Sequence, residues 1–284
     1  MNIQKKKVAF IGCGVMGGAL VKAVAKVISP SNIFVCDHNI DKLDKLATEI
    51  GVIPVANYTE LLSKNVDFLF LASKPQYICE ILSDIYKTKT NKIPEVIISI
   101  AAGITLKQLH DTEKKYLSEN NLQTNTSFVR LMPNTPAQIG EGMIALSINE
   151  SDKTHQIVTD IKALLEKAGK TEQVSEKLMD AVTAISGSGP AYVYLFIEAL
   201  ADAAVAFGMS RKNAYTFAAQ TVKGSAAMVI KTEKHPGLLK DAVCSPGGTT
   251  IAAVEALEDF GMRRAIQKGA QAAFEKSFKM SNNS

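Results

Sequence analysis

The glycine-rich segment near the N-terminus constrains the fold of this chain more than any other feature. It reads Gly12-Cys13-Gly14-Val15-Met16-Gly17, follows the apolar run VAFI directly and opens a segment with apolar residues on one helical face. In such a loop Gly12 permits a tight turn, Gly14 lets the backbone approach a pyrophosphate, and Gly17 lets the helix pack closely on the strand. The N–H groups at the helix N-terminus would then meet the anion. The segment therefore predicts a strand, a turn and a helix that bind a dinucleotide.

Short β-branched runs alternate with helical patterns from residue 7 to about residue 174. The runs are KVAFI, NIFVC, DFLFLA, EVIISIA and SFVRLM. This rhythm is typical of a parallel sheet with crossover helices. Residues 68–72 and 96–100 are apolar without alternation, as expected of central strands covered on both faces. We predict an α/β Rossmann-type N-terminal domain with a mostly parallel sheet over residues 1–172.

The character of the sequence changes after Ser175, where the β-branched runs stop and alanine-rich segments follow, separated by SGSGP, GMSR, HPG and SPGG. This pattern predicts an all-α C-terminal domain over residues 173–284. Within it, residues 190–207 start with a proline, which suits the first turn of a helix, and are apolar on almost every side. So short a domain has few neighbours to surround such a helix. We expect a second copy of the chain to cover it; a monomeric core is the alternative.

Composition excludes several classes of function. The chain has 32 Lys and Arg against 28 Asp and Glu, scattered along it, which argues against a nucleic-acid partner. The longest apolar stretch, residues 191–209, is interrupted by Glu198 and Asp202, so we expect no membrane span. Without a secretory pattern, CxxC pairs or metal-ligand spacing, we expect a cytoplasmic protein with no metal site. Cys13 and Cys244 lie in candidate site loops, where we interpret them as small packing residues.

Asp37 ends the second apolar run, where a carboxylate would bind the hydroxyls of the adenosine ribose. That position favours NADH, because a 2′-phosphate would be repelled. His38, Lys42 and Lys45 lie nearby and could offset this repulsion. Asp37 could instead cap the helix that starts near Ile40. The choice between NADPH and NADH therefore stays open.

Two further loops follow central strands, at the edge of the sheet where ligands of such folds bind. They read Ala72-Ser73-Lys74-Pro75-Gln76 and Ala101-Ala102-Gly103, and both are candidate walls of the cofactor site. Lys74 could equally be a surface lysine before a helix.

A second glycine-rich loop, Ser245-Pro246-Gly247-Gly248-Thr249-Thr250, precedes the helical run IAAVEAL. Its glycines and first-turn N–H groups would form a nest for an anion, most naturally a carboxylate. A loop with a threonine N-cap is the alternative.

Six motifs in this order, IGCGVMGGAL, SKPQ, SIAAGI, RLMPNTPAQIGEG, DAVTAISGSGPAYVY and SPGGTT, resemble the pyrroline-5-carboxylate reductase family over nearly the whole chain. The pairing of SGSGPAY with SPGGTT is far more specific than the first glycine loop. The resemblance implies an oxidoreductase that transfers hydride from NADPH or NADH to the C=N carbon of 1-pyrroline-5-carboxylate and yields L-proline, the last step of proline biosynthesis. It also implies a homodimer, with the number of dimers in a larger assembly left open, in which the SPGGTT loop reaches the partner's cofactor site.

The resemblance and the loops together give a set of candidate site residues. The substrate-binding set is Glu176, Ser245, Gly247, Gly248, Thr249 and Thr250, with Thr250 as the catalytic residue that hydrogen-bonds the ring nitrogen. The cofactor-binding set is Gly12, Gly14, Val15, Met16, Gly17, Asp37, His38, Asn57, Ala72, Ser73, Lys74 and Ala102. The chain departs from the family at Ser73, where an apolar residue is common, and the family varies near Asp37.

The chemistry of imine reduction fits these residues. All four histidines lie outside the motifs, so a histidine acid is not expected. A protonated imine already carries its proton, so a modest donor such as Thr250 suffices. The nearest rival, a 3-hydroxyacid dehydrogenase, would place a lysine in the helical half, where this chain reads SGSGPAYVYLF. A non-catalytic NAD(P)-binding regulator would not need the second nest.

Overall fold

The computed structural model describes residues 3–88, 93–120, 124–149 and 154–282, and the chain divides into two compact units. The first unit comprises Met1–Gly187 and Ala273–Ser284, and the second comprises Ser188–Ala272. The boundary expected at residues 172–173 falls inside the last strand, β8 (Gly169–Gln173). The chain continues to pack on the first unit beyond that strand, since Nδ2 of Asn134 donates to the carbonyl oxygen of Ser186 at 3.0 Å.

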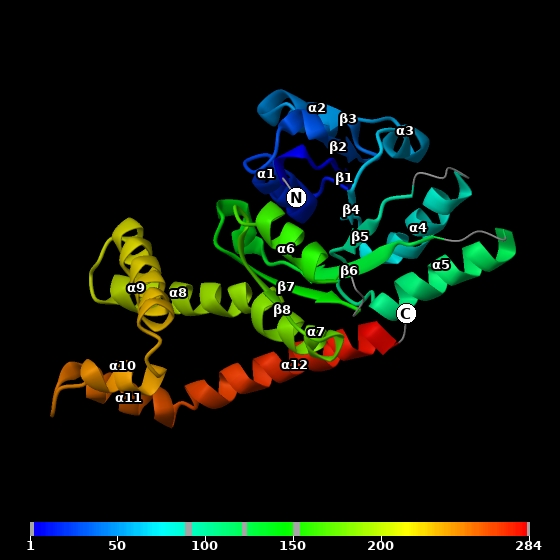
Figure 1. Cartoon of the computed structure of the whole chain (residues 1–284). Helices are drawn as coiled ribbons and strands as arrows, with labels where there is room; N and C mark the ends of the chain where they lie inside the picture. The colour runs from blue at the N-terminus through cyan, green and yellow to red at the C-terminus, as the bar shows by residue number, and fades with distance from the viewer. Residues whose placement is uncertain (1–2, 89–92, 121–123, 150–153, 283–284) are drawn as a thin grey trace. The chain divides into compact units, whose positions relative to one another are not determined.

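In the described part of the first unit, eight strands form one sheet in the order β3-β2-β1-β4-β5-β6-β7-β8 (Figure 1). Besides β8 the strands are β1 (Val8–Ile11), β2 (Ile33–Cys36), β3 (Ile53–Pro54), β4 (Phe68–Leu71), β5 (Val96–Ser99), β6 (Ser127–Met132) and β7 (Gly142–Ile148). Neighbouring strands are parallel except β6 and β7. The predicted mostly parallel Rossmann-type sheet is confirmed, and each of the five predicted runs forms a strand.

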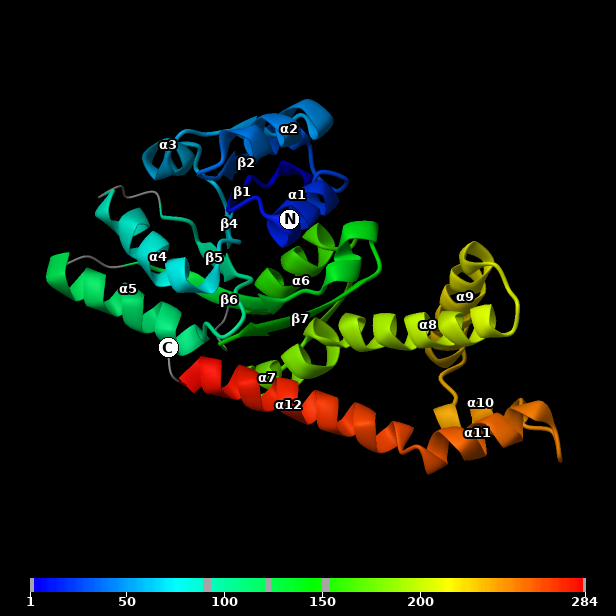
Figure 2. The same ribbon diagram turned by 180° about the vertical axis from the view of Figure 1, so that it is seen from behind.

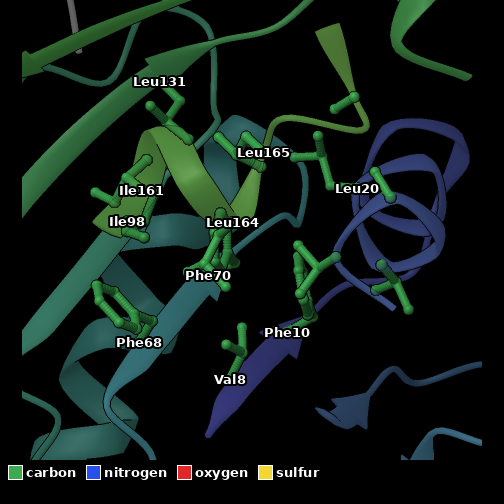
Figure 3. Packing of buried hydrophobic residues seen from close by; sticks show 14 of the residues in the cluster. Val8, Phe10, Leu20, Phe68, Phe70, Ile98, Leu131, Ile161, Leu164 and Leu165 are labelled. Atoms are coloured by element: carbon green, nitrogen blue, oxygen red, sulfur yellow. The ribbon is translucent and has the colours of Figure 1, made fainter. Parts of the chain in front are cut away.

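Helices cover both faces of this sheet. They are α1 (Val15–Val24), α2 (Ile40–Ile50), α3 (Tyr58–Ser63), α4 (Ile78–Lys87), α5 (Leu106–Asn120), α6 (Thr154–Leu164) and α7 (Met179–Val182). One apolar core lies between the sheet and α1, α2 and α6, and the other between the sheet and α3, α4 and α5. Figure 3 shows the first core, with Phe10 and Phe70 of the strands beside Leu20 of α1 and Leu164 of α6. Because the buried strands β1, β2, β4 and β5 are parallel, the loops that follow them lie at the same edge of the sheet.

The second unit is helical, as predicted. Its helices are α8 (Gly189–Ala206), α9 (Arg211–Thr232), α10 (Pro236–Ala242), α11 (Thr249–Asp259) and the first part of α12 (Met262–Asn282). Pro190 lies in the first turn of α8, where its missing N–H costs nothing. Three alanines, Ala201, Ala214 and Ala218, are buried where α8 and α9 pack together.

Much of the apolar surface of α8 is left exposed. Leu195 is 66% exposed and Phe207 is 87% exposed, and Val193, Tyr194 and Phe196 are also exposed. So large an apolar face on one helix marks a surface that something else covers. Among the described residues, the helical segment 176–206 is also long and apolar enough to cross a membrane by length and composition alone.

Candidate active site

The glycine loop that follows β1 is shaped by close backbone contacts. Gly12 has a φ of +99°, and a Cβ at this position would lie 2.6 Å from the carbonyl carbon of Ala72. A Cβ at Gly17 would lie 2.2 Å from the carbonyl oxygen of Gly12. Both glycines are therefore required by the fold itself, for the tight turn and for the close approach of helix and strand that were predicted.

Gly14 differs from these two glycines because it faces open space. A Cβ at Gly14 would meet no atom within 4 Å. Gly14 is the N-cap of α1, and no side chain of the described residues caps this helix end. Val15, the first residue of the helix, is 73% exposed, and Met16 beside it is half-buried. The first-turn N–H groups of α1 are thus open to an anion, as a pyrophosphate site requires.

Asp37, at the end of β2, is hydrogen-bonded through both carboxylate oxygens. Its Oδ2 accepts the backbone N–H of Cys13 at 2.6 Å, and its Oδ1 accepts that of Asn39 at 2.9 Å. The cap of α2 is Asn39, whose Oδ1 accepts the N–H of Lys42 at 3.2 Å. The alternative that Asp37 caps this helix is therefore wrong; Asp37 holds the glycine loop instead.

A cavity of about 350 Å³ lies beside Asp37, on the side of α3 and α4. It is lined by Ile11, Gly12, Cys36, Asp37, His38, Tyr58, Ser73, Tyr77, Glu80, Ile81 and Asp84. The structure thus brings four predicted cofactor residues together, Gly12, Asp37, His38 and Ser73. His38 is almost fully exposed at the rim, with Nδ1 3.2 Å from Oδ1 of Asp37. The volume is at the low end for ligand sites and suits a nucleoside.

Three further predicted cofactor residues, Asn57, Ala72 and Lys74, are next in the chain to residues that line this cavity. Asn57 precedes the cavity residue Tyr58 and caps α3, because its Oδ1 accepts the N–H of Glu60 at 2.9 Å. Oγ of Ser73 donates to the carbonyl oxygen of Ile11 at 3.4 Å, which joins the β4 loop to the end of β1. Lys74 is exposed at the start of a short helical turn. Within the described part of the chain, the Lys74 side chain makes no hydrogen bond or ion pair with the other predicted residues.

A second cavity, of about 520 Å³, lies on the other side of the glycine loop. Gly14 and Val15 line it together with Lys22, Lys42, Lys45 and Glu49, and Glu49 pairs with Lys22, which leaves Lys42 and Lys45 as the excess positive charge. The glycine loop therefore has a basic side, opposite to the side on which Glu80 and Asp84 face the first cavity.

The cysteines beside the loop are packing residues. Cys13 and Cys36 are buried and have free thiols. Burial, with a smaller contribution from the Asp37 carboxylate, raises the pKa of the Cys13 thiol to about 12. Burial also raises the pKa of Cys36. A thiol that stays protonated at neutral pH is a poor nucleophile, so the structure favours packing at Cys13.

Glu176 makes contacts that the sequence did not predict. Its Oε1 accepts the backbone N–H of Leu106 at 3.1 Å and pairs with Nη1 of Arg130 at 2.9 Å. The predicted contact between Glu176 and the substrate stays a prediction. Arg130 was missed as a candidate, although an arginine inside the otherwise apolar run SFVRLM was a signal for a buried ion pair.

The loop Ser245–Gly248 of the helical unit is a tight turn before α11. Gly247 has a φ of +66°, and the N–H of Gly248 donates to the carbonyl oxygen of Ser245 at 3.0 Å. The N-cap of α11 is Gly248, so the alternative of a threonine N-cap is wrong, and no described side chain caps this end. Thr249 and Thr250 are the first two residues of the helix. Each unit therefore offers a glycine-built, uncapped helix N-terminus to an anion.

The described residues contain no group of three His, Cys, Asp or Glu side chains placed to hold a metal ion.

Two family models match this chain, one in each of its two parts. The family model described as pyrroline-5-carboxylate reductase dimerisation matches residues 176–280. The model described as NADP oxidoreductase, coenzyme F420-dependent, matches residues 7–103. The first match covers the helices with the exposed apolar face, including all of the segment 176–206, whose length and composition alone would suit a membrane.

Similar proteins match over nearly their full length. Pyrroline-5-carboxylate reductase of Escherichia coli (strain K12) is 40% identical over 282 residues, which cover 99% of this chain and 100% of that protein. The crystal structure of Plasmodium falciparum pyrroline carboxylate reductase with NADP bound matches with a TM-score of 0.82 at 31% identity, and covers 98% of this chain and 99% of that one. A pyrroline-5-carboxylate reductase from Coxiella burnetii also gives a TM-score of 0.82, at 33% identity over 97% and 98% of the two chains. With this extent of identity over nearly the full length of both chains, the chain belongs to the pyrroline-5-carboxylate reductase family.

Proposed function

We propose that this protein reduces 1-pyrroline-5-carboxylate to L-proline, the last step of proline biosynthesis, as an NAD(P)H-dependent oxidoreductase acting on a cyclic imine. The observation that carries the proposal is the pair of uncapped, glycine-built helix N-termini at α1 and α11, in a chain 40% identical to a pyrroline-5-carboxylate reductase over its length. The nicotinamide cofactor, when bound, supplies the hydride to the C=N carbon.

The first nest would hold the cofactor. The N–H groups after Gly14 bind the pyrophosphate, with Val15 and Met16 covering it, and Asp37 and His38 face the adenosine end. Ala72, Ser73 and Lys74 form one wall and Ala102 the other, with Asn57 fixing the position of Tyr58. The chain fits this group because Gly14 leaves a path free of any Cβ and the adjoining cavity suits a nucleoside.

The second nest would hold the substrate. The N–H groups around Gly247 and Gly248, with the hydroxyls of Ser245 and Thr249, bind the carboxylate. Thr250 hydrogen-bonds the ring nitrogen and is the catalytic residue, because its hydroxyl can donate to the lone pair that forms on that nitrogen as the carbon accepts the hydride. Positioning supplies most of the rate, since well-oriented reactants can gain roughly 7 to 11 kcal/mol.

The assembly would be a homodimer in the cytoplasm, and the number of dimers in any larger assembly stays open. The family match to a dimerisation region and the exposed face of α8 support the pairing. We propose that the SPGGTT loop of one subunit serves the cofactor site of its partner, which gives two equivalent sites across a two-fold axis.

NADPH and NADH are both kept as cofactors. Asp37 disfavours a 2′-phosphate by its charge, whereas Lys42 and Lys45 on the basic side of the loop would attract one.

The test follows NADH and NADPH oxidation separately, with 1-pyrroline-5-carboxylate and with a 3-oxoacid. We expect turnover only with the imine, and turnover of the oxoacid alone would contradict the proposal. To test the shared site, two variants, Gly14→Glu and Thr250→Ala, are mixed, dissociated and reassociated. If a site combines the glycine loop of one subunit with the SPGGTT loop of its partner, one of the two sites in a mixed dimer has both loops intact, and part of the activity should return. If verified mixed dimers recover no activity, both loops of a site belong to one subunit.

A further inference from the structure

The loop between β5 and α5, residues 100–105, is held by residues that lie far from it in the sequence. We propose that Glu176, Asp180, Ser277 and Ser281 are positioning residues that brace this loop against the cofactor. The proposal rests on the proposed function in one respect, that Ala102 of this loop contacts the cofactor. All the contacts that support it lie within the first unit.

The two ends of the loop are fixed by hydrogen bonds. Oγ of Ser99, a fully buried residue at the end of β5, accepts the N–H of Ala101 at 3.3 Å. At the other end, Oε1 of Glu176 accepts the N–H of Leu106, the first residue of α5, at 3.1 Å. Arg130 of β6 holds the same oxygen through Nη1 at 2.9 Å, so the loop end is tied to the sheet.

The middle of the loop is covered by the last turns of α12. Gly103 has a φ of +79°, and a Cβ at this position would lie 3.2 Å from Cβ of Met280. A larger residue at this position would strain the backbone and would require Met280 to shift by a few tenths of an ångström. Gly103 therefore packs closely against α12.

Asp180 of α7 holds these turns of α12 by hydrogen bonds. Its Oδ1 accepts Oγ–H of Ser277 at 2.6 Å and Oγ–H of Ser281 at 2.9 Å, and Ser277 is only 5% exposed. Figures 1 and 2 both show the C-terminal end of α12 alongside α7. Glu176 and Asp180 lie at one end of the matched dimerisation region, residues 176–280, and Ser277 and Met280 lie at the other. Both ends of that region thus meet at one cofactor loop.

The ion pair between Glu176 and Arg130 contributes little to the stability of the fold, because burying its polar atoms costs free energy. Arg130 is 2% exposed, and its Nε and Nη2, like Oε2 of Glu176, have no hydrogen-bond partner in the described part of the chain. The Glu176 side chain is 30% exposed, and an ion pair that buries an arginine while such atoms stay unsatisfied adds little net stability. Its clear effect is geometric, since it fixes the N-terminus of α5 and with it the loop. Supporting contacts of this kind set how accurately a bound group is held.

The experiment removes the clamp on α12 with the double variant Ser277→Ala, Ser281→Ala, in the full-length enzyme. Alanine favours a helix, so α12 should still form. The matched control, Ser63→Ala, Ser118→Ala, removes two exposed hydroxyls that bond only within their own helices. The conservative variant Asp180→Asn keeps the acceptor oxygen for both serines.

We expect the double variant to raise the KM for the nicotinamide cofactor on the order of tenfold, as displacement of a positioning element does. The KM for 1-pyrroline-5-carboxylate at saturating cofactor, and the sedimentation coefficient, should stay within error of the wild type. Asp180→Asn and the control should behave like the wild type. A double variant with a lower Tm but an unchanged cofactor KM would overturn the proposal, because the clamp would then only stabilise.

Hydrogen exchange gives a readout independent of turnover. Amides of residues 100–106 should exchange faster in Glu176→Ala and in the double serine variant than in the wild type, with residues 8–11 of β1 unchanged. Unchanged exchange across the loop would overturn the bracing. A wild-type protein that oxidised no NAD(P)H with the imine would overturn the proposed function instead, and faster loop exchange would still support the bracing.

Discussion

The backbone N–H of Cys13 donates to Oδ2 of Asp37 at 2.6 Å, so the carboxylate at the end of β2 fixes the shape of the glycine loop at the end of β1. The other oxygen is engaged by Asn39. One side chain thus both supports the glycine loop and lines the first cavity. If the proposed cofactor site is correct, cofactor choice and loop geometry are linked at a single residue.

Replacement of Asp37 by asparagine should change cofactor preference. Asp37→Asn removes a negative charge beside the place of a 2′-phosphate but keeps Oδ1 as an acceptor for one backbone N–H. We expect the ratio of kcat/KM for NADPH to kcat/KM for NADH to rise on the order of tenfold. Steady-state kinetics with each cofactor measures it, with Asp41→Asn on exposed α2 as the charge-matched control. An unchanged ratio would show that Asp37 acts only on the loop.

Two glycines of the same loop should respond differently to alanine. In Gly17→Ala the new Cβ would meet the carbonyl oxygen of Gly12, so we expect the free protein to lose roughly 1 to 3 kcal/mol of unfolding free energy. In Gly14→Ala the Cβ enters open space, so the Tm of the free protein should change little while cofactor affinity falls. Thermal unfolding with and without NADPH separates the two effects. A stabilisation by NADPH that is equal in Gly14→Ala and wild type would argue against a pyrophosphate at Gly14.

Thr250→Ala tests the catalytic assignment. The variant should lower kcat/KM for the imine at least about tenfold, about 1.4 kcal/mol of transition-state stabilisation, while cofactor affinity stays nearly the same. The control is Thr216→Ala, because the hydroxyl of Thr216 only donates to the carbonyl oxygen of Lys212 within α9. Turnover equal to that of the wild type would remove Thr250 from the mechanism.

The thiol of Cys13 should resist alkylation despite its place in the loop. Burial, aided by the charge of Asp37, raises its pKa to about 12, so very little thiolate forms up to pH 10. We expect iodoacetamide to label the partly exposed Cys79 and Cys244 first, as read by peptide mass spectrometry. Protein unfolded in urea provides the control in which all four cysteines are accessible. Early labelling of Cys13 in the folded protein would contradict its burial.

Most of the sheet could be predicted because its strands are continuous apolar runs. β3, β7 and β8 were not predicted, for different reasons. β3 has only two residues, Ile53–Pro54, and β8 reads GKTEQ, a polar edge strand without a hydrophobic pattern. β7 (Gly142–Ile148) pairs antiparallel with β6, which the alternating rhythm of a parallel sheet does not suggest. The division into two units could not be predicted either. No local sequence pattern indicates that the last part of α12 packs on the first unit.

The candidate site was predicted where a motif has a local physical cause. Gly12 and Gly17 follow from close backbone approach, and the nest before α11 follows from Gly247 and Gly248. The contacts of Glu176 with Leu106 and Arg130 could not be predicted, since they join residues 70 and 46 positions apart. Such pairings are set by the packing of distant elements, which one sequence does not show.

The first unit is discontinuous in the chain, because its last residues, 273–284, arrive through α12 after the helical unit is complete. A fragment ending at residue 187 would lack the turns of α12 that cover Gly103. The side of the 100–105 loop that packs against these turns would then be exposed to solvent. Exchange of the helical half with that of another reductase therefore needs two junctions rather than one, because the chain leaves the first unit after residue 187 and returns to it at residue 273.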